Sequence, residues 1–188
     1  MFYFSIILIL TLKYFTMKYN IRVSKLKNSK LDALYTLITY TSFGHYLFLV
    51  SNIINKYRLL NKNIRNIINI TTYCILFSNT FGYWLVEYPK NRSKSIKTGF
   101  ILDVIGHGPP LLIFLEITDF IITDFKDIIY PILLSIFWLS FVWYPWYKIT
   151  GNTVYSSLSD DLSIQKKLVN ILQIFIVNFI GFCLYKFY

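Results

Sequence analysis

The chain has 188 residues, of which 55% are hydrophobic and 20% aromatic, and its formal net charge is +10. This length fits one domain, but so apolar a composition excludes an ordinary soluble protein and indicates an integral membrane protein. The basic residues stand in short runs between apolar segments, without a motif for base or phosphate recognition, and so favour loops beside anionic lipid head groups over a nucleic-acid surface. We therefore expect an all-α fold, a polytopic transmembrane helix bundle of about six spans forming a single domain over residues 1–188.

Apolar segments long enough to cross a bilayer, at about 1.5 Å per residue, follow one another along the chain. The first crosses Lys13 and lacks the basic start and small-residue cleavage site of a signal peptide, so we expect a span, with an interfacial helix as the alternative. The predicted spans are 2–19, 31–54, 67–88, 100–122, 128–147 and 168–188.

The basic residues are unevenly divided between the loops. Of the 19 lysines and arginines, 13 belong to the first, third and fifth loops. The positive-inside rule then predicts that these odd loops are cytoplasmic and that both termini face the other side. Nothing in the sequence indicates the organelle or the oligomeric state.

The fourth predicted span contains the strongest candidate for a catalytic site, the sequence Gly106-His107-Gly108-Pro109-Pro110. Two adjacent prolines remove backbone donors and disfavour helix before them, so we expect a break around Gly108. Asp103 lies one helical turn before His107, where a carboxylate would hold the imidazole in one tautomer, as in a general base. The alternative is a kinked packing helix whose histidine bonds a neighbouring carbonyl.

The second predicted span carries hydroxyl groups at about the same depth in the membrane as His107. Thr36 and His107 lie about 8 and 10 Å along their helices, and Asp32 and Thr39 extend the second span's polar stripe. Glu87 and Tyr155, from the end of the third span and the fifth loop, are expected at the same pole. Alternatively, such hydroxyls bond their own preceding turn or hold helices together.

Several motifs appear in an order known from one family. They are His107 followed by Pro110 and Glu116, the run Trp143-Tyr144-Pro145-Trp146, the later Thr150-Gly151-Asn152-Thr153-Val154-Tyr155, and Leu34-Tyr35-Thr36-Leu37. From about residue 30 onward the chain resembles the androgen-induced-protein-like family of multi-span membrane threonine hydrolases, which act on fatty acid esters of hydroxy fatty acids. Tyr130-Pro131 and Gly151-Asn152 give a weaker similarity to the related rolling stone family.

The resemblance implies a lipid ester hydrolase with Thr36 as nucleophile and His107 as base. Asp103, Tyr155 and Asp32 would support them, and Thr39 or Thr41 are alternative nucleophiles. Backbone amides at 106–108, or Tyr155, would hold the oxyanion. We expect no cofactor and no metal; the expected partners are membrane lipids and a lipid ester, not nucleic acid. The other hypotheses are a non-catalytic membrane adaptor of rolling-stone type, and a small transporter that binds its substrate at the broken fourth span.

Overall fold

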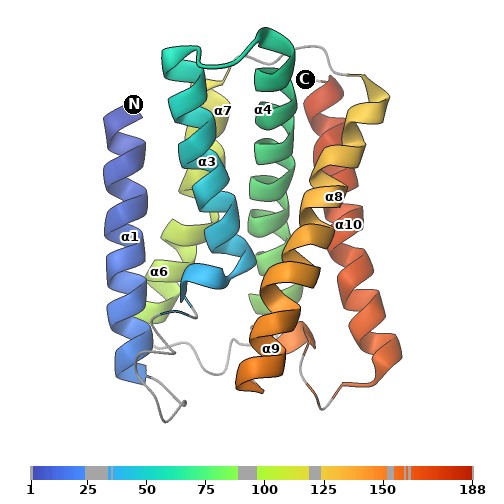
Figure 1. Ribbon diagram of the computed structural model, residues 1–188. Helices are drawn as coiled ribbons and strands as arrows, with labels where there is room; N and C mark the ends of the chain where they lie inside the picture. Colours follow the sequence, from blue (N-terminus) through green and yellow to red (C-terminus); the bar gives the residue numbers. More distant parts are fainter. Residues whose placement is uncertain are drawn as a thin grey trace.

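The computed structural model describes residues 2–23, 34, 36–88, 97–118, 124–151, 155–158, 160 and 162–187. Over these residues the chain is all helical and has no β-strand. The helices pack side by side in a bundle (Figure 1). They are α1 (Phe2–Val23), α3 (Tyr40–Tyr57), α4 (Lys62–Phe77), η1 (Ser78–Glu87), α6 (Lys97–His107), α7 (Pro109–Ile117), η3 (Phe125–Ile128), α8 (Ile129–Phe137), η4 (Trp138–Trp143), α9 (Tyr144–Thr150), η5 (Ser156–Leu158) and α10 (Ile164–Phe187).

The helices run alternately up and down the bundle. α1, the continuous rod of α4 and η1, and the rod of α8, η4 and α9 point one way, whereas α3, α6 with α7, and α10 point back (Figure 1). α1 therefore begins, and α10 ends, at the same end of the bundle.

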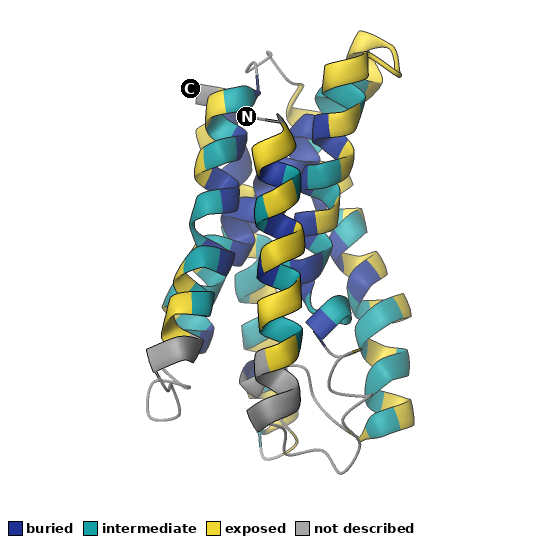
Figure 2. Cartoon of the chain, turned by 90° about the vertical axis from the view of Figure 1, so that its left-hand side faces the viewer, coloured by how far each residue is buried: buried dark blue, intermediate teal, exposed yellow. Residues whose placement is uncertain are grey.

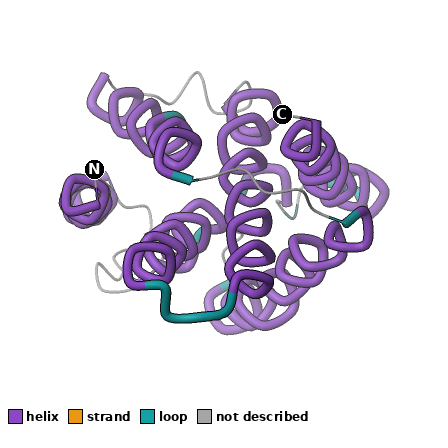
Figure 3. Tube along the Cα trace, turned by 90° about the horizontal axis from the view of Figure 1, so that it is seen from above, coloured by secondary structure: helices purple, strands orange, loops and turns teal. Residues whose placement is uncertain are grey.

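Helix α4 lies in the middle of the bundle, as the view along its length shows (Figure 3). Every residue from Asn69 to Phe77 is buried. Its apolar side chains join those of α1, α3, α7 and α10 in one cluster, which includes Ile9, Phe48, Phe114 and Phe182. A helix buried all round needs apolar neighbours on every side, and this arrangement supplies them.

The outer faces of the helices are also apolar. Figure 2 shows buried residues on the inner faces and exposed ones outside, and on α10 the exposed residues include Leu172, Ile176 and Phe179. Among the described residues, three helical stretches are long and apolar enough to cross a membrane: Phe100–Ile117, Phe125–Thr150 and Ile164–Lys186. Large exposed apolar surfaces of this kind suggest a membrane protein.

The predicted break in the fourth segment is confirmed. α6 ends at His107, and α7 begins at Pro109 with its two prolines in the first turn. Gly108 separates the helices with φ −110° and ψ −67°. Proline is favoured in a first helical turn, where no amide donor is required, so the prolines end one helix and start the next.

The predicted second segment, 31–54, is not one continuous helix. Residues 36–38 are helical, but Thr39 is extended, with φ −60° and ψ 152°, and α3 starts after it. The Thr39 side chain accepts a hydrogen bond from the Ser42 amide and so caps the helix. Thr36 precedes this break, so the predicted single polar stripe through Thr36 and Thr39 is wrong.

Two segments are wound more widely than an α-helix. η1 continues α4, and η4 joins α8 to α9, both as π-helix. The amide of Tyr88 donates to the carbonyl of Tyr83, five residues back, and Tyr144 donates to Leu139 in the same way. π-Helical turns are rare and often occur at functional sites, and η1 supplies much of the site described next.

Candidate functional site

His107 is held at the end of α6 by two residues of η1. Its Nδ1 lies 3.1 Å from the carbonyl oxygen of Asn79, and its ring stacks on Tyr83 with centroids 3.7 Å apart and planes 4° apart. A carbonyl only accepts, so Nδ1 carries the proton and Nε2 carries the lone pair. His107 is 8% exposed, and its ring therefore holds an unprotonated nitrogen, Nε2, in a fixed position.

Asp103 supports this histidine indirectly. It lies one turn before His107, as expected, but its carboxyl group is hydrogen-bonded to the hydroxyl of Tyr83. The carbonyl of Asn79 holds Nδ1 in the place where the sequence predicted a carboxylate. Asp103 thus fixes the aromatic ring that stacks on the imidazole.

A second polar cluster lies where α1 meets the start of α3, around the fully buried Ser42. Lys13 Nζ donates to Ser42 Oγ at 2.5 Å, Ser42 Oγ donates to the carbonyl of Thr36, and Thr39 Oγ1 lies 2.8 Å from Ser42 Oγ. Thr36 is buried, with 2% of its surface exposed. This cluster brings both predicted hydroxyl residues to one place.

The Lys13 side chain, which is bonded to Ser42, also lies within electrostatic range of the two histidines. Its ammonium group is close enough to interact electrostatically with His45 and with His107. Thr36 thus belongs to the cluster around Ser42, whereas His107 belongs to the contacts with η1.

His45 plays a different part from His107. Its Nε2 lies 2.8 Å from the carbonyl oxygen of Gly106, so this nitrogen carries the proton. The ring, 1% exposed, ties α3 to the end of α6. The chain's two histidines therefore have opposite tautomers and use backbone carbonyls on different helices.

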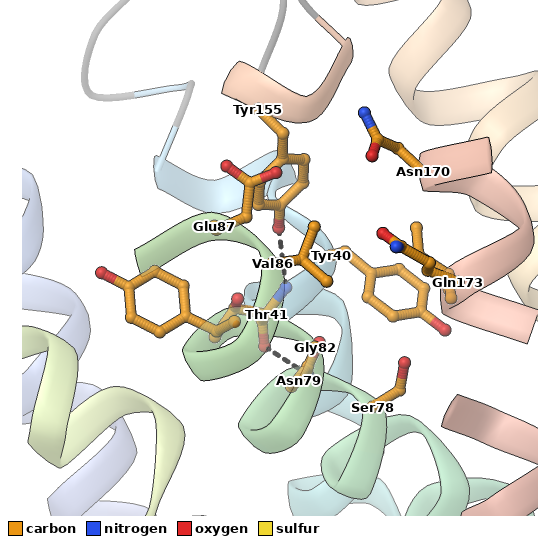
Figure 4. Close-up of a pocket in the computed structure, with 12 residues that line it drawn as sticks. Tyr40, Thr41, Ser78, Asn79, Gly82, Val86, Glu87, Tyr155, Asn170 and Gln173 are labelled. Carbon is orange, nitrogen blue, oxygen red and sulfur yellow. Dashed lines mark hydrogen bonds between the residues drawn. The ribbon is translucent and has the colours of Figure 1, made fainter. Parts of the chain in front are cut away.

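A cavity of about 60 Å³ lies beside η1. Thr41, Asn79, Tyr83, Glu87 and Tyr155 are among its lining residues, which come from α3, η1, α10 and the segment before α10 (Figure 4). Asn79 and Tyr83 therefore touch both the cavity and His107. Glu87 and Tyr155, which were expected at one pole of the bundle, both line this cavity.

Tyr155 accepts a hydrogen bond from the Thr41 amide at 3.4 Å. Burial raises the pKa of Tyr155 to about 12, so its phenol stays protonated at neutral pH. The phenol remains a candidate donor to an oxyanion. The amide of Gly108, the other candidate region, donates instead to the carbonyl of Val104 at 3.2 Å.

Asp32, predicted as a supporting residue, lies outside the described residues. Within the described part of the chain, no three His, Cys, Asp or Glu side chains are grouped so that they could hold a metal ion.

Sequence reasoning missed the contributions of Asn79, Tyr83, Ser42 and Lys13. Asn79 and Tyr83 follow each other at a spacing of four in an otherwise aromatic, apolar stretch, and this spacing was the signal available for a shared face. Lys13 carried a clearer signal, because a lysine in an apolar segment is costly unless it has a partner.

No protein-family model, no curated protein and no solved structure matches this chain. The fold thus defines a class, an all-helical protein that has, among its described residues, three helices able to span a membrane. The resemblance to the androgen-induced-protein-like hydrolases rests on sequence motifs alone.

Proposed function

We propose that this chain is a multi-pass membrane hydrolase that cleaves lipid esters, such as fatty acid esters of hydroxy fatty acids, with His107 as general base. The observation that carries the proposal is the hydrogen bond between His107 Nδ1 and the carbonyl of Asn79. Because it keeps the proton on Nδ1, Nε2 is ready to accept a proton from a hydroxyl group.

In the proposed reaction, Nε2 of His107 takes the hydroxyl proton of Thr36, and the threonine oxygen attacks the ester carbonyl carbon. The alcohol then leaves with the proton from His107, and an acyl-enzyme remains. His107 next takes a proton from a water molecule, whose oxygen attacks the acyl carbon. The bond between this carbon and the Thr36 oxygen breaks, the proton passes from His107 to the Thr36 oxygen, and the fatty acid is released. The reaction requires the Thr36 hydroxyl and His107 Nε2 to come within hydrogen-bonding distance, and catalytic hydrogen bonds often tighten only when substrate binds.

Tyr83 and Asp103 would assist the proton transfer. The stacked ring of Tyr83 presents its negative face to the imidazole, which favours the imidazolium ion formed in the reaction. Asp103 accepts from the Tyr83 hydroxyl and so holds the ring in place. The Tyr155 hydroxyl would donate to the oxyanion.

For topology, we propose that the odd loops face the cytoplasm. The helices alternate in direction (Figure 1), so the ends of α1 and α9 lie at the same end of the bundle. This arrangement agrees with the concentration of lysine and arginine in the odd loops.

The second candidate function is that of a non-catalytic membrane adaptor. It is favoured where polar side chains in the bundle only hold helices together. Tyr40, Ser135 and Asn178 form such a network, with distances of 2.7 and 3.3 Å, between α3, α8 and α10.

The test is covalent labelling of detergent-solubilised protein by a fluorophosphonate lipid probe. Thr36→Ala and His107→Asn should each reduce the labelling rate by about 10²-fold or more. Thr39→Ala and His45→Asn are the matched controls and should label as the wild type does. If Thr39→Ala alone abolishes labelling, Thr39 is the nucleophile; if the wild type takes no label, the adaptor hypothesis is favoured.

A further inference from the structure

The cavity beside η1 is lined by amide side chains from two helices that contact each other. Asn79 comes from η1, and Gln173 comes from α10 (Figure 4). Apolar side chains, Val86 and Ile174, and the rings of three tyrosines form much of the remaining wall. Among the described residues that line the cavity there is no lysine, arginine or histidine. A ligand in this cavity therefore meets amide groups set in a largely apolar surface.

The side-chain oxygen of Asn79 is an acceptor without a donor. Its Nδ2 donates to the carbonyl of Thr41 at 3.5 Å, and a Cβ added at Gly44 would collide with the same nitrogen, so the nitrogen faces α3. The other amide atom, Oδ1, is buried with no hydrogen-bond partner among the described residues, and Asn79 as a whole is 5% exposed. An unsatisfied buried acceptor is unfavourable, so a ligand that supplies a donor would be stabilised here.

Gln173 brings a second acceptor of this kind to the same cavity. Its Oε1 is also buried and has no hydrogen-bond partner within the described part of the chain. Figure 4 shows its amide group and that of Asn79 on different elements around the cavity. Two unsatisfied amide oxygens at one cavity favour a ligand that carries at least two donors.

We propose that this cavity binds a small polyol through its hydroxyl groups, either a free compound such as glycerol or the glycerol group of a monoacylglycerol. Hydroxyl groups supply donors for Asn79 Oδ1 and Gln173 Oε1, and the carbon skeleton suits the apolar wall. A charged ligand would lose more hydration against such a wall than a hydroxyl group does. At about 60 Å³ the cavity admits a polyol or a head group and not a whole lipid. This binding goes beyond the proposed hydrolysis and does not depend on it.

The test is a titration of purified protein in phosphatidylcholine nanodiscs with glycerol, followed by saturation-transfer nuclear magnetic resonance. Glycerol trimethyl ether has the same carbon skeleton without O–H donors. Glycerol should bind saturably and the ether should not. Asn79→Leu and Gln173→Leu each replace an amide by an apolar side chain of similar size, and each should weaken glycerol binding about tenfold. Gln165→Leu, which changes an exposed amide on α10, is the control and should bind as the wild type does.

A competition arm identifies the source of the polyol, and the melting temperature of each variant checks its folding. If monooleoylglycerol displaces glycerol and methyl oleate does not, the occupant is the glycerol group of a lipid; if neither displaces it, the occupant is a free polyol. Displacement by methyl oleate, equal binding of glycerol and its ether, or undiminished binding by Asn79→Leu and Gln173→Leu would overturn the proposal. Glycerol binding without ester hydrolysis would refute the proposed function alone.

Discussion

At the scale of single residues, the site depends on which nitrogen of each histidine holds the proton. The sequence placed Asp103 correctly one turn from His107, but spacing along one helix says nothing about a neighbouring helix. Because α6 ends at His107, the ring reaches the carbonyl of Asn79 on η1. A backbone carbonyl is present at every residue, so no side-chain pattern reveals this partner.

The two histidines should therefore be distinguishable by nuclear magnetic resonance. In protein labelled with ¹⁵N-histidine at pH 8, His107 should appear as the Nδ1–H tautomer and His45 as the Nε2–H tautomer, assigned by His45→Asn. The physical reason is that each ring donates to a carbonyl from a different nitrogen. Two Nε2–H tautomers would contradict the assigned role of His107.

At the scale of elements, the break at Gly108 was predictable and the break at Thr39 was not. Two prolines stop a helix by their covalent structure, whatever surrounds them. Thr39 interrupts the second segment through a hydrogen bond from the Ser42 amide to its side chain, which competes with the helix only in the right context. The π-helical winding of η1 also left no signal in the sequence, although it positions Asn79 and Tyr83.

The contact between α10 and α4 gives a prediction for stability. A Cβ at Gly181 would lie 3.0 Å from two ring atoms of Phe77, in the buried core. Gly181→Ala should therefore lower the free energy of unfolding by about 1–3 kcal/mol, measured as a fall in melting temperature. At Gly106 the added Cβ would meet Leu12 at 3.8 Å, an ordinary contact, so Gly106→Ala is the control and should change the melting temperature little. Equal effects of the two variants would show that this packing is looser than described.

At the scale of the whole molecule, composition predicted an all-helical protein, and the described residues form helices joined by short turns, with no β-strand among them. The number of spans was harder to predict, because length and hydropathy single out three described stretches. α4 begins with Lys62 and Arg65 and is buried from Asn69 to its end at Phe77, so its apolar residues can serve the protein core as well as a bilayer. The pattern of apolar residues along one helix does not show whether an apolar face packs in the protein core or contacts lipid.

The proposed topology predicts which ends of the bundle a membrane-impermeant maleimide can reach. Lys148→Cys, near the end of α9, should react with the maleimide added outside the cell only after the membrane is permeabilised. The reason is that basic odd loops stay in the cytoplasm. Lys62→Cys, at the opposite end of the bundle (Figure 1), should react from the other side. Reaction of both from one side would show that the bundle does not cross the membrane as proposed.

We propose that His107 drives ester hydrolysis inside a membrane. The most direct measurement is release of fatty acid and hydroxy fatty acid from a branched fatty acid ester in proteoliposomes, followed by mass spectrometry. The wild type should release both products in equal amounts, and His107→Asn, with an unchanged melting temperature, should release them about 10²-fold more slowly or not at all. Release by the wild type no faster than by His107→Asn would contradict it.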